Sequence, residues 1–144
     1  MVNRFDLMLG DWVFLKGTPV RISRLLPEGF TTNTFFGDND KIVYKYEDAE
    51  PIFITQQLLI DNGWGTGMYA YYEISDRAYL DYYYHEHRLR RFYHKGMYSQ
   101  KESQNSRELT FQCHCSYLHE LQHAAKMCGV KLEFKTIRHY GKDE

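Results

Sequence analysis

Turn-forming residues divide the first part of this chain into short apolar segments, and this spacing constrains its fold more than any other feature. Glycine, proline, asparagine and aspartate cluster at residues 16–19, 27–29 and 37–40. Such residues interrupt helices and strands because they favour tight turns. The segments between them have the length and composition of β-strands. We therefore expect a small antiparallel sheet, curled into an SH3-like barrel, over residues 1–49.

The second half of the chain carries similar signals around further apolar segments. Thr55 is suited to cap a short helix that ends before Gly63, because glycine readily adopts the left-handed conformation that ends helices. The polar residues 96–107 are predicted to form an exposed loop. Three strands of an antiparallel meander are predicted at residues 68–74, 78–84 and 88–94, and a further strand at residues 108–113.

Residues 116–128 give the strongest helix prediction in the chain. Ser116 is a suitable N-cap, and Gly129 stands where the end of a helix favours glycine. Apolar residues at three- and four-residue steps form one stripe along this helix: Leu118, Leu121, Ala125 and Cys128. Residues 130–134 then alternate between apolar and charged side chains, which predicts a final strand.

Together these segments predict an α+β fold. It comprises a small N-terminal antiparallel sheet, a short helix, and a tyrosine-rich antiparallel meander packed against a C-terminal helix and a final strand. We expect a single domain over residues 1–144, because one domain usually has about this length. The alternative is a subdivision into a small β-barrel at residues 1–49 and an α+β part at residues 50–140.

Charge and cysteine content narrow the classes of function only slightly. The formal net charge is -1, so the whole chain has no strong electrostatic attraction to nucleic acid or anionic membranes. Three cysteines, an odd number, argue against a disulfide framework and favour reduced thiols. No apolar run has the length of a membrane span, and the first residues do not have the pattern of a signal peptide. We therefore expect a cytoplasmic protein that does not associate with membranes.

Three motifs stand in the same order here and in a known group of proteins. They are residues 9–13 (Leu-Gly-Asp-Trp-Val), residues 51–64 (Pro-Ile-Phe-Ile-Thr through Asn-Gly-Trp) and residues 117–129 (Tyr-Leu-His-Glu-Leu-Gln-His through Cys-Gly). Through them the chain resembles a family of small uncharacterised proteins of gut bacteria and their phages and mobile elements. That family has no known activity, and the second histidine of its last motif is often asparagine. The resemblance implies an accessory or phage context, and it implies no catalytic residue or ligand.

Residues 119–123, His-Glu-Leu-Gln-His, match the H-E-x-x-H pattern of zinc peptidases. On a helix, His119 and His123 share one face and can hold one zinc ion. Glu120 would then act as general base toward a metal-bound water. A zinc metallopeptidase-like protein, with zinc as its cofactor, is therefore one alternative function.

Several observations favour a structural helix over this zinc site. His119 and His123 lie away from the apolar stripe, on a face with Lys126 that is predicted to be solvated. The extended motif would place its third ligand at residue 129, which is Gly129. The positive charge of Lys126 would also oppose a metal dication. The favoured interpretation has neither a metal nor another cofactor.

A second, weaker zinc candidate is the Cys-His-Cys sequence at residues 113–115. On a strand its two thiols would share one side, and a histidine of the following helix could join them. Structural zinc sites more often separate paired cysteines by two or more residues. We therefore favour two small buried residues on a core strand.

Residues 85–95 combine basic and aromatic side chains. On a strand, Arg88 and Arg90 would share a face with Phe92, and Arg91 adds another guanidinium. Such a surface can pair arginines with phosphates and stack bases on rings. The net charge of -1 favours a merely solvent-facing strand instead. A nucleic-acid-binding module that uses residues 88–95 is therefore a second alternative function.

The function we expect is that of a non-catalytic binding or interaction protein with a protein partner. Aromatic residues make up 17% of the chain and include 13 tyrosines, and tyrosine suits both sheet faces and contact surfaces. An exposed aromatic patch would mark a protein interface, with side chains from Tyr71, Tyr82, Tyr84 or Tyr93. The candidate binding surface comprises Arg88, Arg90, Arg91, Tyr82, Tyr84 and Tyr93.

Overall fold

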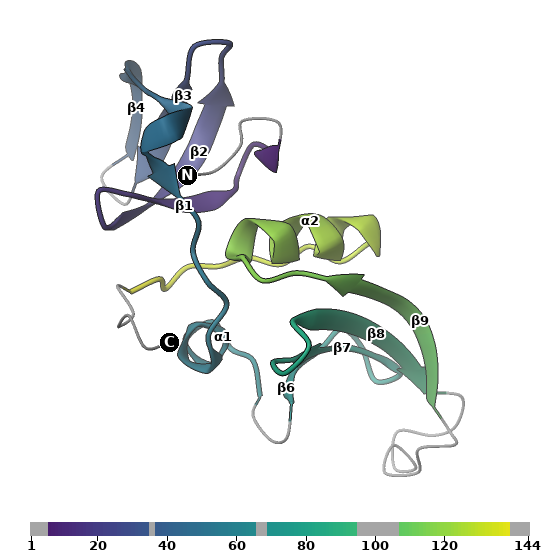
Figure 1. Ribbon diagram of the computed structural model, residues 1–144. Coiled ribbons are helices and arrows are strands. Elements are labelled where there is room, and N and C mark those ends of the chain that lie inside the picture. Colours follow the sequence, from purple (N-terminus) through teal and green to yellow (C-terminus); the bar gives the residue numbers. More distant parts are fainter. Residues whose placement is uncertain (1–5, 35–36, 66–68, 95–106, 139–144) are drawn as a thin grey trace. The chain divides into compact units, whose positions relative to one another are not determined.

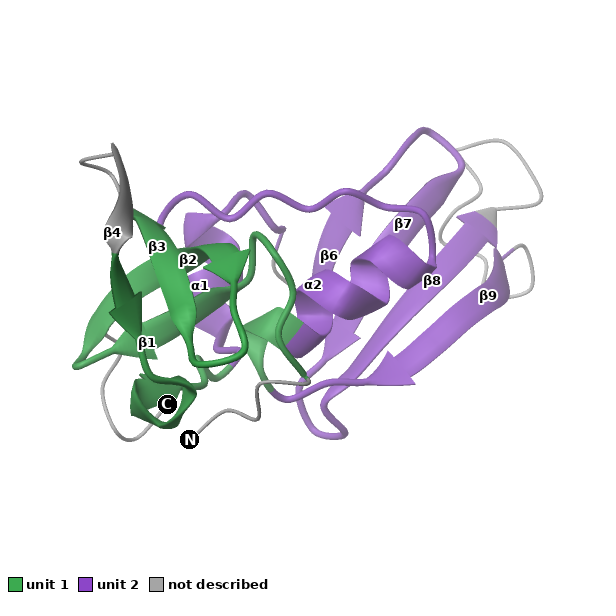
Figure 2. Cartoon of the chain, turned by 90° about the horizontal axis from the view of Figure 1, so that it is seen from above, with its two compact units in different colours: residues 1–53, 117–119, 137–144 green, residues 54–116, 120–136 purple. Residues whose placement is uncertain are grey.

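The computed structural model describes residues 6–34, 37–65, 69–94 and 107–138 (Figure 1). The chain forms two compact units (Figure 2). The first unit comprises residues 1–53, 117–119 and 137–144, and the second comprises residues 54–116 and 120–136. The described residues hold two antiparallel sheets and two α-helices, so the predicted α+β fold is confirmed.

The first unit is built on a curled, five-stranded antiparallel sheet with the strand order β4-β3-β2-β1-β5. Its strands are β1 (Trp12–Leu15), β2 (Thr18–Leu25), β3 (Phe30–Thr34), β4 (Gly37–Tyr44) and β5 (Ala49–Glu50). Lys16 and Gly17 join β1 to β2 with positive φ angles of 52° and 80°, the backbone that a two-residue hairpin turn requires. The register shifts between Ile22 and Arg24, and such irregularities bend a strand and curl the sheet.

One glycine between β2 and β3 allows a close backbone approach. A Cβ atom at Gly29 would lie 2.1 Å from the carbonyl oxygen of Tyr44, so no other residue fits there without displacing backbone. Tyr44 and Tyr46 in turn pack on Phe30, with ring centroids 6.0 and 5.7 Å away. The buried core that they flank comprises Leu7, Val13, Leu15, Val20, Ile22, Phe30 and Ala49.

Residues 37–40 differ from the prediction. They were expected to form a turn between two strands, but they form the first half of β4. Gly37 pairs with Thr34, and Asp38 pairs with Asn33. Pairing with β3 therefore outweighs the local preference of these residues for a turn.

The second unit contains a four-stranded antiparallel meander with the order β6-β7-β8-β9. Its strands are β6 (Ala70–Glu73), β7 (Ala78–Tyr83), β8 (Arg88–His94) and β9 (Arg107–His114). The helix α1 (Gln56–Asp61) precedes this sheet, and α2 (Leu118–Met127) follows it. Residues 120–127 of α2 lie over one face of the sheet (Figures 1 and 2), as the prediction of a meander packed against a C-terminal helix requires.

The helix ends follow the sequence signals closely. The Thr55 hydroxyl accepts a hydrogen bond from the amide of Leu58 at 3.1 Å and so caps α1. Gly63 and Gly129 end the two helices with φ angles of +91° and +80°. The helix α2 begins at Leu118, one residue later than an N-cap at Ser116 would place its first residue.

The predicted final strand at residues 130–134 is absent, because this described segment has no regular secondary structure. The alternation is real, since Val130 and Phe134 are buried while Lys131 and Glu133 are exposed. The following residues are held by one side chain instead of a strand ladder. The amide group of Asn62 accepts hydrogen bonds from the backbone amides of residues 135 and 136, and it donates one to the carbonyl of residue 136.

Of the loop predicted at residues 96–107, all but Arg107 lies outside the described residues, and Arg107 begins β9. Among the described residues, no helix has both the length and the apolar character needed to cross a membrane.

Candidate binding surface

The H-E-x-x-H segment lies on α2, and its first histidine is not solvated. His119 is only 4% exposed, and its ring stacks on Tyr117 with centroids 5.8 Å apart and planes 6° apart. The prediction that His119 lies on a solvated face is therefore wrong. Buried positions cover much more of the helix than one stripe, because Gln122 and Ala124 are buried beside the predicted apolar residues.

Glu120 has a structural contact where a peptidase would need a general base. Its carboxylate accepts a hydrogen bond of 3.0 Å from the backbone amide of Ser116, just before the helix. This contact satisfies an amide near the helix N-terminus, where a negative charge is also favourable. Among the residues that the structure describes, no group of three or more His, Cys, Asp or Glu side chains is placed to hold a metal ion. A catalytic zinc needs three protein ligands.

One cysteine of the second zinc candidate is in surroundings that disfavour metal binding. Cys115 is buried, and burial raises the pKa of its thiol to about 12. A thiol binds zinc as the thiolate, which this environment disfavours. The carbonyl oxygen of Cys115 accepts a hydrogen bond from the Tyr82 hydroxyl at 2.6 Å, so this residue helps to hold the core.

The arginines of β8 lie on two different faces of the sheet. Side chains alternate along a strand, so Arg88 and Arg90 lie on one face and Arg91 on the other. Arg91 lies on the face that α2 covers, where its guanidinium donates to the carbonyl of Cys128 at the end of that helix. The three arginines therefore do not share one face of the sheet.

The opposite face of this sheet is left uncovered by the described elements of the second unit (Figure 1). We call it the open face. The strand register groups its side chains in rows across the sheet. Its residues are Tyr69, Tyr71, Glu73, Tyr79, Asp81, Tyr83, Arg88, Arg90, Phe92, Arg107, Leu109, Gln112 and His114.

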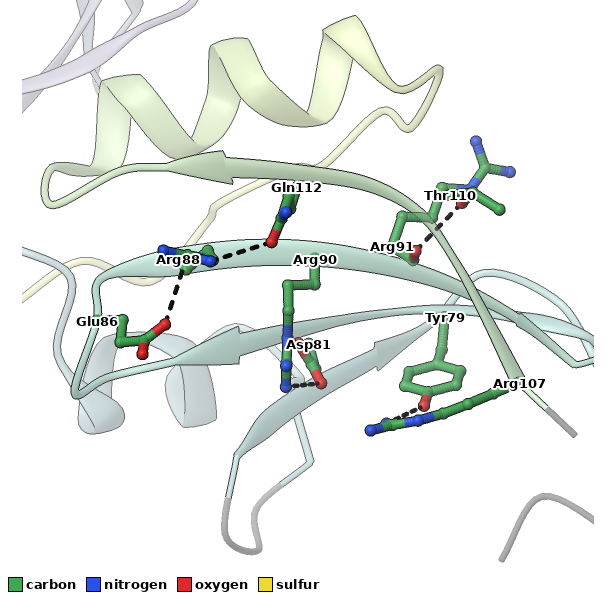
Figure 3. A network of polar contacts seen from close by, with 9 residues as sticks. All are labelled: Tyr79, Asp81, Glu86, Arg88, Arg90, Arg91, Arg107, Thr110 and Gln112. Carbon is green, nitrogen blue, oxygen red and sulfur yellow. Dashed lines mark hydrogen bonds and ion pairs between the residues drawn. The ribbon is translucent and has the colours of Figure 1, made fainter. Parts of the chain in front are cut away.

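An ion pair lies at the centre of the open face. Arg90 donates from Nε and Nη2 to the two carboxylate oxygens of Asp81, both at 2.8 Å (Figure 3). The side chains of Asp81 and Arg90 are only 3% and 19% exposed. Burial raises the pKa of Asp81 above its ordinary value, although Arg90 opposes this shift. A bidentate pair of this kind fixes the plane of the guanidinium.

Aromatic rings surround this guanidinium. The Arg90 Cζ atom lies 5.2 Å from the ring centroid of Tyr69, 5.7 Å from that of Tyr83 and 5.1 Å from that of Phe92. Rings at these distances attract a cation through their negative faces. The rings and the guanidinium therefore hold one another in place.

A second arginine completes the cluster from β9. Arg107 lies over Phe92, with Cζ 4.2 Å from the ring centroid. It donates to the Tyr79 hydroxyl at 3.0 Å (Figure 3). Tyr79 and Phe92 stack, with centroids 5.4 Å apart and an interplanar angle of 23°. The two guanidinium groups thus both contact the Phe92 ring, which also stacks on Tyr79.

Arg88 is the more accessible of the two β8 arginines on this face. Its side chain is 41% exposed and donates to Gln112 at 3.2 Å (Figure 3). Its Nε also lies 3.5 Å from a carboxylate oxygen of Glu86, whose side chain is 52% exposed. Exposed ion pairs of this kind are weak, so the Arg88 guanidinium can exchange this contact for another anion.

The tyrosines chosen from the sequence are distributed differently from the prediction. Tyr82 is fully buried on the covered face, so the prediction that it contributes to an exposed patch is wrong. Tyr84 is half-buried and packs edge-on against Tyr82, with centroids 5.2 Å apart. Tyr93 is exposed, but it lies one residue from Phe92 and pairs with Ala78 on the other face. Tyr71 is the exposed tyrosine of the open face.

Several open-face residues were missed from the sequence. Asp81, Tyr79 and Arg107 were not predicted as site residues, because none of them lies on the strand of the basic segment. The two-residue period of β7 places Tyr79, Asp81 and Tyr83 on one face, and this signal was available. The strand register that joins them to Arg90 was not available from the sequence alone.

A separate polar depression lies beside α1. It has a volume of about 460 Å³, and its lining includes Asp61, Tyr72, Lys131, Glu133 and Lys135. Its lysines and carboxylates balance in charge. The Lys131 Nζ atom lies 3.8 Å from Glu133 Oε1 in an exposed ion pair. This depression therefore offers no concentrated charge or ring surface comparable with the open face.

The chain matches no family model, no curated protein and no solved structure. Its function is therefore inferred from the chemistry of its own residues.

Proposed function

We propose that this protein is a non-catalytic binding module and that the open face is its binding surface. The observation that carries the proposal is an uncovered sheet face on which ordered rings and guanidinium groups lie side by side. Tyrosine and arginine dominate the binding energy of many protein surfaces. A sheet face that presents them is therefore a natural place for a ligand.

The side chains at the centre of the open face are held in fixed conformations, which supports the proposal. Its central side chains, Asp81 and Phe92, are buried, and Arg90 is fixed between a carboxylate and rings. Side chains that are already held in one conformation lose less entropy when a ligand binds. They also belong to paired strands, which position a site more accurately than loops do.

The accessible side chains around this centre supply contact area. Tyr71 is 43% exposed and Leu109 is 44% exposed. Arg88 and Gln112 add donors and acceptors within the same rows of the sheet. An ordered centre surrounded by accessible rings and donors offers a ligand both flat contact area and hydrogen-bond partners.

The zinc peptidase alternative receives less support from the described residues. The Glu120 carboxylate binds the amide of Ser116, and His119 is buried against Tyr117. A peptidase would need both side chains to face a shared cleft with a third ligand. The open face requires no such rearrangement.

The proposal can be tested by selection from two unbiased pools. The immobilised protein would be offered a displayed peptide library and a random pool of single-stranded oligonucleotides. Binders selected by the wild type should bind a Tyr71→Ala variant more weakly, because the exposed ring is part of the surface. They should bind a Tyr93→Ala variant normally, because Tyr93 is 40% exposed but lies on the other face.

A second matched pair of variants controls for the loss of one positive charge. Arg88→Ala removes an accessible guanidinium from the open face, while Arg21→Ala removes an exposed one from β2 in the other unit. Binders that respond equally to both changes, or to neither, would contradict the open face as the binding surface. Failure of both pools to yield any binder would contradict the binding function itself.

A further inference from the structure

We infer that the ligand of the open face is single-stranded nucleic acid, an inference that rests on the proposed function. The open face combines aromatic rings with guanidinium groups. Unpaired bases stack on tyrosine and phenylalanine rings and on arginine planes. The open face presents Tyr69, Tyr79 and Tyr83 around Arg90 and Arg107, which supplies both kinds of planar surface.

Tyr71 is held in a position suited to stacking. It exchanges two backbone hydrogen bonds with Gly65, at 2.8 and 3.1 Å. A Cβ atom at Gly65 would lie 2.3 Å from the Tyr71 Cζ atom, so the ring rests directly against the glycine backbone. This side chain is nevertheless 43% exposed. One side of the ring is thus supported by the backbone, and the remainder is available to a base.

The guanidinium groups of the open face can bind an anionic ligand. Three arginines lie on it, Arg88, Arg90 and Arg107, together with the carboxylates of Asp81 and Glu73 and that of Glu86 beside Arg88. Asp81 is buried, so the accessible surface of the central ion pair belongs mainly to the cation. Accessible guanidinium groups pair with phosphates, often through two hydrogen bonds.

The centre of the open face is less suited to a protein partner. The middle row runs across Tyr71, Asp81, Arg90 and Gln112, so an ion pair and an amide occupy it. The core of a protein interface is usually depleted of charge. Nucleic acid, in contrast, uses donors, acceptors and rings together.

The width of the sheet favours single strands over a duplex. Adjacent strands lie about 4.8 Å apart, so the backbones of β6 and β9 are separated by about 14 Å. The major groove of B-DNA is about 12 Å wide and admits a helix or a two-stranded ribbon. A four-stranded face does not enter this groove, whereas unpaired bases can lie flat on its rings.

The test is a titration of fluorescently labelled oligonucleotides with the full chain, followed by anisotropy. The probes are a single-stranded 12-mer of mixed sequence, as DNA and as RNA, and the DNA duplex of the same sequence. We expect the single strands to bind and the duplex to bind at least about tenfold more weakly. Tyr71→Ala should weaken single-strand binding by about 5- to 100-fold, the usual effect of losing one base–ring stack. Tyr93→Ala should leave it unchanged.

Salt dependence separates phosphate contacts from stacking. The affinity of the wild type should fall with salt, and Arg88→Ala should reduce the slope of log affinity against log salt by about 0.7. The Arg21→Ala variant should keep the wild-type slope. Circular dichroism of every variant checks that the fold is retained.

The outcomes distinguish the two proposals. Peptides that bind through Tyr71 and Arg88, together with no oligonucleotide binding at low salt, would overturn nucleic acid as the ligand and keep the open face as the binding surface. Oligonucleotide binding that is insensitive to both residues would overturn the inference for this face. If neither pool binds through these residues, both proposals fail.

Discussion

The two faces of the β6–β9 sheet are made by the same strands and differ in what their side chains touch. Leu80 and Leu89 are fully buried on the face that α2 covers. The open face holds an ion pair and rings instead, with Arg90 bound to Asp81. Arg91, one residue further along β8, donates to a backbone carbonyl at the end of α2. The charges of a strand therefore have to be counted separately for each face of the sheet, because adjacent side chains point to opposite faces.

Truncation of one leucine on each face should show the largest contrast. Leu80→Ala removes a fully buried side chain and leaves a cavity, so it should lower the free energy of unfolding by about 3–4 kcal/mol. Leu109→Ala is the matched change on the open face, where the side chain is 44% exposed, and should cost less than about 1 kcal/mol. Urea denaturation measures both. Equal costs would mean that the open face is covered in solution.

Removal of a carboxylate from the open face should give the next largest effect. Asp81→Ala leaves the largely buried Arg90 guanidinium without its bidentate partner, and should cost about 2–3 kcal/mol. Glu86→Ala removes the exposed partner of Arg88 and should cost less than about 1 kcal/mol. Thermal and urea unfolding would report both values. If the Asp81 variant were as stable as the Glu86 variant, the central pair would not order this face.

High pH should weaken the covered side of the sheet. Burial raises the pKa of Tyr84 from 10.0 to about 12 and raises that of Tyr82 as well. Between pH 10 and 11 the unfolded chain loses these protons while the folded chain retains them, so stability falls as pH rises. These two tyrosines should contribute about 1–2 kcal/mol of the fall. Urea denaturation at both pH values measures it.

The tyrosine pair provides its own control. In a Tyr82→Phe, Tyr84→Phe double variant no phenol remains at either position, so the pH-dependent loss should become smaller. The variant also loses the hydrogen bond to the Cys115 carbonyl, so its stability at pH 7 should be lower than that of the wild type. An unchanged slope between pH 10 and 11 would assign the loss to other groups.

The smallest change in stability should come from Gly65→Ala. The new methyl group would meet the end of the Tyr71 ring, which can move away, so the cost should be below about 1 kcal/mol. The displaced ring should nevertheless weaken oligonucleotide binding, because the position of Tyr71 defines the stacking surface. Normal affinity in this variant would show that the seating of Tyr71 on Gly65 is unimportant.

Much of the fold was predictable because its signals are local. Thr55 caps α1, and Gly63 and Gly129 end the helices with positive φ angles. Each signal acts within one helical turn, through a single side chain or a missing Cβ atom. Alternation and turn residues likewise predicted the meander, since both depend only on neighbours along the chain.

The candidate site depended on partners that are distant in the sequence. Periodicity placed Arg88 and Arg90 on one face, but only the pairing of β7 with β8 sets Arg90 opposite Asp81. The sequence likewise contained no sign that Arg91 would reach Cys128, 37 residues further along the chain. A strand pattern defines two faces and does not state which one another element covers.

Dependence on distant partners also explains the wrong predictions for His119 on α2 and for residues 130–134 after it. The sequence by itself determined that residues 118–127 form a helix, because apolar spacing and a terminal glycine are sufficient for that. Tertiary structure decided that His119 is buried, and that residues 130–134 alternate without forming a strand. Helix ends and turns are set by bonds within a few residues. Burial and strand pairing are set by what the rest of the fold brings alongside, which local sequence does not encode.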